Sequence, residues 1–260
     1  MRSTATGARA RCRANLLLDP LTLAAVAALG FVAAVVGGVG GFGTGIILAT
    51  ALVPLMGVKA VVPVLAVAGV IINSGRFWFY RSSLDRHALG ILLLNALPFL
   101  ILGTWLYSVL DARTIGTVLG VTVIASVPVR RYLQRREIVL GQTGLAVGAS
   151  VFGHSSGIAT GTGMIQVSLL LGAGLTGPAV LATDALSTIA LDLCKAVLFQ
   201  RFDLLNEEAF IAGVVIGVAS IPGSAIAAWL VTRIHAHLHV LFMEALILFG
   251  GASMLWHAWR

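Results

Sequence analysis

Two glycine-rich stretches decide how this chain folds: residues 37–45 read GGVGGFGTG, and residues 153–163 read GHSSGIATGTG. Both stretches end in Gly-Thr-Gly, and Gly161 follows Gly43 by 118 positions. Such runs interrupt helices, because glycine loses more conformational freedom on folding than any other residue. Corresponding interruptions in two halves of a membrane chain indicate a transport site where the halves meet.

The sequence around these stretches is too apolar for a water-soluble protein. Of the 260 residues, 58% are hydrophobic and only 10% are charged, and the mean hydropathy is +1.00. A soluble domain carries about 25% charged residues, because its surface must face water. The apolar runs are long, whereas a β-barrel would alternate apolar and polar residues in segments of about ten. We therefore predict an all-α membrane protein.

The apolar runs divide into about eight transmembrane segments, since a spanning helix needs about 20 apolar residues. The predicted segments are 16–56, 61–79, 88–109, 115–130, 138–171, 179–199, 209–232 and 239–258. The first and fifth are too long for one straight crossing, and they contain the glycine-rich stretches. Each could be a broken helix or a re-entrant hairpin, and we prefer broken spanning helices because they agree better with the arginine positions.

The segments form two tandem four-helix repeats, the first helix of each being broken at its glycine-rich motif. Leu84-Asp85 recurs as Phe202-Asp203, again 118 positions later. The predicted organisation is a basic tail at 1–15, a first repeat at 16–137 with a basic linker at 130–137, and a second repeat at 138–260. Four crossings are an even number, so we expect both repeats to point the same way, with a pseudo-axis along the membrane normal.

The basic residues predict the orientation. If every segment crosses once, 13 of the 17 Lys and Arg residues fall on the side of the N-terminus and three on the other side. Cytoplasmic loops carry the excess of Lys and Arg, so we predict that both termini are cytoplasmic. The net charge of +7 then reflects topology and contact with anionic lipid, and not nucleic acid. The basic run before an apolar segment also resembles a signal peptide, although no clear cleavage site follows.

The glycine-rich stretches supply the first candidate site residues. A half-helix that begins in either stretch would present N–H groups and a positive dipole end to an anion. The alternative is that the small residues only let helices pack closely. The candidate substrate-binding residues here are Gly43, Thr44, Gly45, Ser155, Ser156, Thr160, Gly161, Thr162 and Gly163.

The sixth segment carries a polar stripe. Thr183, Asp184, Ser187, Thr188, Asp192 and Lys195 lie on one side of a helix, and the other side is apolar. Ionisable groups inside a membrane face a cavity or a partner. We take Thr183, Ser187 and Lys195 as substrate-binding, and Asp184 and Asp192 as proton-coupling candidates. Two alternatives stay open: Asp192 pairs with Lys195 three residues on, and Asp184 caps its helix.

The second segment partly repeats this stripe, because Asn73 and Arg76 have the spacing of Asp192 and Lys195. Both are candidate substrate-binding residues, since a planar guanidinium suits sulfonate or carboxylate oxygens. Alternatively, Arg76 extends to water at the membrane surface. We predict no metal and no cofactor. The rings of the alternating histidines 235, 237 and 239 point apart on a helix, with no cysteine to complete a zinc shell.

Residues 174–185, GLTGPAVLATDA, resemble the loop and helix start after the second glycine motif in the sulfite exporter TauE/SafE family. The duplicated four-helix plan and the paired glycine-rich stretches resemble that family too, over nearly the whole chain. The resemblance implies a transporter of the bacterial inner membrane that exports a small anion such as sulfite or an organosulfonate. The expected partners are that anion and the lipid bilayer, and we leave a homo-oligomer open.

These features favour a secondary transporter, with proton coupling as a further expectation. An enzyme would need a nucleophile beside its base, and the neighbours His154 and Ser155 do not face one another on a helix. No nucleotide-binding motif of the Walker type is present. The alternative is a structural or accessory membrane subunit, which would leave the charged residues of the sixth segment without a role.

Overall fold

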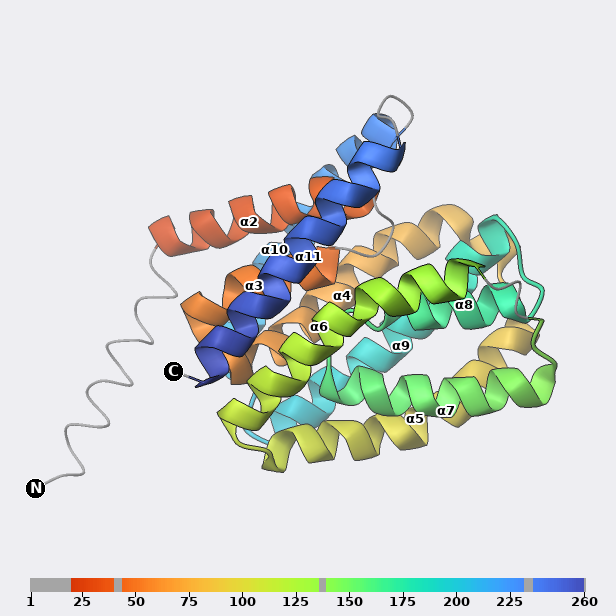
Figure 1. Ribbon diagram of the computed structural model, residues 1–260, viewed down its shortest axis with the longest axis horizontal. Coiled ribbons are helices and arrows are strands. Elements are labelled where there is room, and N and C mark those ends of the chain that lie inside the picture. Colours follow the sequence, from red (N-terminus) through yellow and green to blue (C-terminus); the bar gives the residue numbers. More distant parts are fainter. Residues whose placement is uncertain (1–19, 40–43, 136–138, 232–235, 260) are drawn as a thin grey trace, which may run out of the picture.

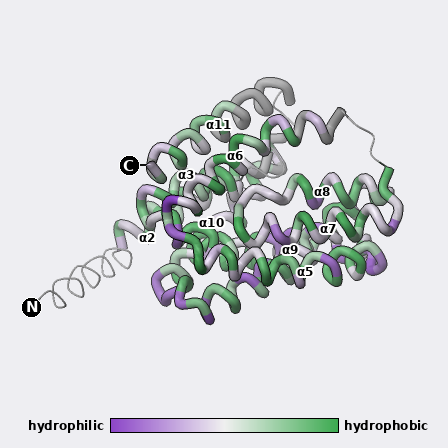
Figure 2. The backbone as a smooth tube through the Cα atoms, turned by 60° about the horizontal axis from the view of Figure 1, so that its bottom comes forward, coloured by the Kyte–Doolittle hydropathy of each residue, from purple (hydrophilic) through white to green (hydrophobic). Residues whose placement is uncertain are grey.

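The computed structural model describes residues 20–39, 44–135, 139–231 and 236–259, and all regular structure in these ranges is helical (Figure 1). The predicted all-α class is thereby confirmed for the described residues. Hydrophobic residues run along most of each described helix, and hydrophilic ones gather mainly near helix ends (Figure 2). Gly43 lies outside the described residues, so the structure gives it no position.

Five described helices contain stretches long and apolar enough to cross a membrane. They are α2 (Pro20–Val39), α4 (Val58–Tyr80), α5 (Arg86–Val109), α6 (Ala112–Arg135) and α10 (Glu207–Val231). The other α-helices are α3 (Thr44–Met56), α7 (Gln142–Ile158), α8 (Gly163–Gly172), α9 (Pro178–Arg201) and α11 (Ala236–Trp259). A 3-10 turn, η1 (Arg81–Ser83), follows α4. Helix α9 is less apolar because it carries Asp184, Asp192 and Lys195.

The predicted segment 138–171 contains two helices that run antiparallel. The Leu140 backbone N–H, just before α7, donates to the Gly172 carbonyl at the end of α8 over 2.6 Å, and Leu169 packs against Gly148. Gly161, with φ of 82°, lies in the turn between them. Our preference for one bent spanning helix is therefore wrong here, because a left-handed glycine lets the chain reverse within a few residues.

The start of the chain is arranged similarly. The end of α2 lies against the start of α3, since a Cβ on Gly37 would overlap the Thr44 backbone. Gly57, with φ of 81°, is the single residue between α3 and α4. Helices α2 and α4 both run parallel to α10. Gly30 of α2 faces Ile216 of α10, and Ala34, one turn further along α2, faces Gly223; in the same way Val64 and Ile71 of α4 face Gly213 and Gly217. Helices α2 and α4 therefore start on the same side.

Helices α4 and α9, which correspond in the sequence repeat, run antiparallel. Gly69 of α4 faces Asp192 of α9, whereas Arg76, further along α4, pairs with the earlier residue Asp184. Helices α6 and α11 also correspond and are antiparallel, with Gly116 against Ala258 and the later residue Ile124 against the earlier Gly251. The expectation that corresponding helices point the same way is wrong for these two pairs.

This arrangement changes the orientation argument. The start of α2 and the end of α11 lie toward the same end of the bundle (Figure 1), as expected. However, α4 starts on the side of Pro20, so Arg81 and Arg86 at its far end lie on the opposite side. The distribution of 13 basic residues on one side and three on the other rested on the assumption that every segment crosses once, so it does not hold. The side that faces the cytoplasm stays a prediction.

Small residues bring helices α5 and α7 close together. A Cβ on Gly153 would overlap the Ala96 carbonyl, and a Cβ on Gly157 would overlap the Leu100 carbonyl. These two glycines of the second stretch therefore serve close packing between membrane helices. Buried aliphatic residues form one cluster that includes α3, α4 and α10, and a second cluster on α5, α7, α8 and α9.

Candidate functional site

A cavity of about 220 Å³ lies where these two apolar clusters meet. Its walls come from the start of α3, the middle of α4, the α7–α8 turn and one face of α9. Most candidate residues line it: Thr44, Gly45, Asn73, Arg76, Ser156, Thr160, Gly161, Thr162, Gly163, Asp184, Asp192 and Lys195. Residues from four separate segments of the chain thus share one space inside the helix bundle.

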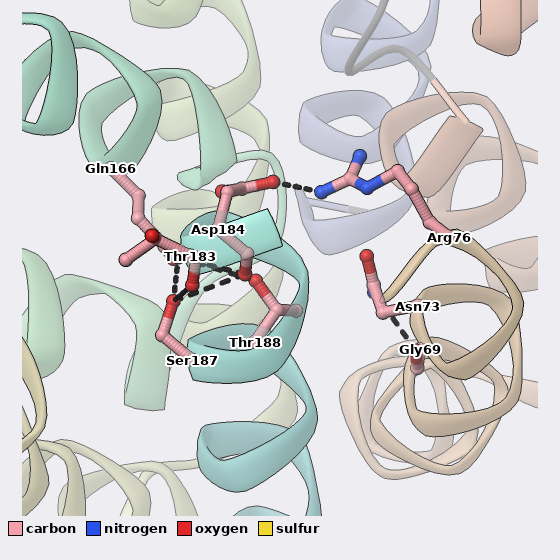
Figure 3. A network of polar contacts seen from close by, with 8 residues as sticks. All are labelled: Gly69, Asn73, Arg76, Gln166, Thr183, Asp184, Ser187 and Thr188. Atoms are coloured by element: carbon pink, nitrogen blue, oxygen red, sulfur yellow. Dashed lines mark hydrogen bonds and ion pairs between the residues drawn. The ribbon is translucent and has the colours of Figure 1, made fainter. Parts of the chain in front are cut away.

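An ion pair crosses this cavity from α4 to α9. Arg76 Nη2 donates to Asp184 Oδ2, and the two side chains point toward one another (Figure 3). The Arg76 side chain keeps 31% of its surface exposed, and Asp184 keeps 7%. The capping alternative for Asp184 is wrong, because Gly177 is the N-cap of α9. The alternative that Arg76 only extends to water is also wrong, since its guanidinium binds a carboxylate.

A second ion pair lies further along α9. Lys195 Nζ is 2.6 Å from Asp192 Oδ1 and 3.5 Å from Ser156 Oγ. The i, i+3 pair that we considered is therefore present, and both of its members also line the cavity. Gly69 makes room for it, because a Cβ there would overlap Asp192 Oδ2. Asn73 donates to the Gly69 carbonyl over 2.9 Å, so its amide is tied to its own helix.

Three candidates do not line this cavity. The Thr183 hydroxyl accepts from the Asp85 backbone N–H at the start of α5 over 3.2 Å. Ser187 Oγ donates to the Thr183 carbonyl over 2.6 Å. Ser155 Oγ donates to the Val151 carbonyl over 2.9 Å, and Ser155 lines a different, mostly apolar hollow beside α6. These contacts tie helices together or stay within one helix.

Gln166 of α8 was missed by the sequence argument. Its side chain is 1% exposed, lines the cavity, and donates through Nε2 to the Asp184 carbonyl over 3.2 Å and to Ser187 Oγ (Figure 3). It holds α8 to the turn of α9 that carries Asp184. An amide inside an apolar membrane segment was the available signal, because buried polar groups there need partners.

The cavity walls offer unused hydrogen-bond donors. Among the described residues, Arg76 Nε and Thr160 Oγ1 are buried without a hydrogen-bond partner. Helix α8 begins at Gly163 in the cavity wall, and no side chain caps its first turn. Unsatisfied N–H groups at a helix start favour an anion. The ionisable side chains that line the cavity are two bases and two carboxyl groups, so their formal charges balance.

Two predictions concern residues that lie outside the part of the chain that the structure describes. Gly43 belongs to the undescribed residues 40–43. The histidines at 235, 237 and 239 also lie outside, because residue 235 and the side chains of the other two are not described. The expectation that they bind no metal stays a prediction.

The family model described as Sulfite exporter TauE/SafE matches residues 26–256. The chain belongs to this family. The resemblance seen in the sequence is thereby confirmed, and the TauE/SafE chain is a multi-pass membrane protein of a transporter family. Comparisons with curated proteins and with solved structures returned no match.

Proposed function

We propose that this TauE/SafE protein is a secondary transporter that exports a small anion, such as sulfite or an organosulfonate, across the bacterial inner membrane. The observation that carries the proposal is the cavity inside an apolar bundle. Two basic side chains line it, and so does the uncapped first turn of α8. Cationic side chains at this depth are costly unless they have a function or a partner. The family to which the chain belongs supports an anion as the cargo.

The proposed contacts follow from donor chemistry. Arg76 offers a planar fork of N–H groups for two oxygens of a sulfonate or sulfite, and Lys195 offers a compact positive charge. The hydroxyls of Thr44, Thr160 and Thr162 and the first N–H groups of α8 complete the set. An oxyanion that enters would replace water with these fixed donors.

We also propose that the chain contains two structural repeats, each built from four segments of which the first is a helical hairpin. The antiparallel packing of α4 on α9 and of α6 on α11 supports repeats of inverted orientation. A site between inverted repeats can open to either side when one repeat rocks against the other. The cavity between α4 and α9 fits such a site.

Proton coupling is the finer part of the proposal, and Asp184 and Asp192 are its candidates. An anion adds negative charge to a cavity whose described charged groups balance. Protonation of one carboxylate would restore that balance and bring one proton with the anion. The partner of each carboxylate, Arg76 or Lys195, is also the proposed partner of the anion.

Sulfite flux into or out of proteoliposomes tests the function. Wild-type protein should carry sulfite, and Lys195→Gln should reduce the initial rate roughly tenfold or more, because one buried charge is then missing. The control Arg113→Gln removes a cation that stacks on Trp259, outside the cavity, and should keep the wild-type rate. Absence of sulfite and organosulfonate flux in the wild type would contradict the proposal and favour an accessory subunit.

A double variant separates binding from packing. If Lys195 only neutralises Asp192, then Lys195→Gln with Asp192→Asn removes both charges and should restore flux. If Lys195 binds the anion, the double variant stays as slow as Lys195→Gln. Circular dichroism and gel filtration of each variant show whether the fold is kept.

A further inference from the structure

Arg76 uses only part of its hydrogen-bonding capacity. A guanidinium has five N–H donors in a rigid fork. Among the described residues, Arg76 donates one hydrogen bond, from Nη2 to Asp184, and its Nε has no hydrogen-bond partner. The side chain lines the cavity and keeps about a third of its surface exposed. An oxyanion in the cavity could therefore reach the fork from the open side.

The Asp184 carboxylate binds Arg76 through a negatively charged oxygen, as the oxygens of a carboxylate or sulfonate ligand would. Within the described residues, no other side chain donates to its carboxylate; Gln166 donates to the Asp184 backbone carbonyl instead. The carboxylate thus depends on Arg76, and an anion that binds both Nη groups of the fork needs the Nη2 that Asp184 occupies. The pair also links α4 to α9 across one end of the cavity (Figure 3).

Resting on the function proposed above, we propose that the transported anion binds Arg76 by displacing Asp184, which acts as a built-in competitor for the same guanidinium. The ligand class is an anion with at least two oxygens on one centre, as in sulfite, a sulfonate or a carboxylate. Displacement also removes this ion pair between α4 and α9, so anion binding loosens that end of the helix pair, while Gly69 still packs on Asp192. Asp184 therefore weakens binding and couples it to helix movement.

The test measures methanesulfonate and sulfite binding to the purified full-length chain by isothermal titration calorimetry. Asp184→Asn removes the competing charge and should tighten binding about tenfold. Arg76→Gln should weaken it by about tenfold or more. The matched controls are Asp111→Asn and Arg81→Gln, since Asp111 is exposed at the start of α6 and Arg81 stacks on Trp78 outside the cavity. Both controls should bind like the wild type.

Equal or weaker binding by Asp184→Asn overturns the proposal, because a merely structural partner would leave Arg76 misplaced. If that variant is not monodisperse, Asp184→Ser gives the same comparison with a smaller side chain. Dimethyl sulfone, a neutral analogue of methanesulfonate, should bind neither Asp184→Asn nor Asp184→Ser more tightly than the wild type. If the wild type binds no anion and carries no flux, the proposed function fails; if it binds and Asp184→Asn is not tighter, only the competitor role fails.

Discussion

At the scale of single residues, the site depends on a glycine of α4 as much as on the polar side chains of that helix. Gly69 has no side chain where Asp192 of α9 approaches, so the carboxylate lies against the α4 backbone and still reaches Lys195. Six residues later Gly75 lies on the same helix, and a Cβ there would meet nothing within 4 Å. Alanine substitutions at these two glycines therefore distinguish a steric requirement at Gly69 from a general effect of glycine on the flexibility of α4.

We predict that Gly69→Ala lowers both stability and transport. The new Cβ would overlap Asp192 Oδ2, so Asp192 must leave Lys195 or the helices must shift, at a cost of about 1–3 kcal/mol. Thermal unfolding should start at a lower temperature, and sulfite flux per folded protein should fall. Gly75→Ala should be at least as stable as the wild type, because alanine is the better helix former, and should carry sulfite at the wild-type rate. Wild-type flux in Gly69→Ala would show that the Asp192–Lys195 geometry has no part in transport.

At the scale of elements, the turn between α7 and α8 decides which groups reach the cavity. The reversal brings Thr160, Thr162 and the start of α8 to the cavity wall, to which Thr44 at the start of α3 also belongs. The left-handed conformation of Gly161 makes that reversal possible without the steric cost of a Cβ. A straight or bent continuation of α7 would carry these residues out of the site.

Gly161→Ala should therefore destabilise the hairpin. The substitution forces an L-residue into φ of 82° and places a Cβ against the Ile46 side chain, with an expected cost of about 1–2 kcal/mol. Differential scanning fluorimetry should show a lower unfolding temperature. Gly141→Ala, just before α7 and with open space around its Cβ position, is the control. Equal unfolding temperatures for the two variants would count against the tight turn.

At the scale of the whole molecule, helices from the two halves of the chain interleave. Helix α2 packs on α10 and α5 packs on α7, while α4 and α9 cross at the cavity (Figure 1). The cavity therefore lies between parts of the chain that are far apart in sequence. This placement is what a transport site needs, because each side of the membrane must gain access in turn.

The sequence predicts the helices well where apolar runs have clear ends. The expected segments 88–109 and 209–232 nearly match α5 (Arg86–Val109) and α10 (Glu207–Val231). The sequence left a reversal at the second glycine-rich stretch open as one of two alternatives, and the arginine positions favoured the other; hydrophobic periodicity could not decide, because it does not report a backbone φ such as that of Gly161. Helical spacing could place Asp184 on the polar face of α9 but could not identify Arg76 as its partner, since 108 residues separate them.

The most direct test of the central claim asks whether anions reach the cavity between α4 and α9. Thr188, which lines it, is replaced by cysteine in a chain whose Cys12 and Cys194 are changed to serine. The protein is then treated with a methanethiosulfonate reagent that carries a sulfonate, and Ser82→Cys in exposed η1 serves as the control. We predict that Thr188→Cys is modified and that methanesulfonate, which does not react with the reagent, slows its modification in a saturable way, while the modification of Ser82→Cys does not change. No modification at position 188, or a rate there that methanesulfonate does not change, would contradict the account.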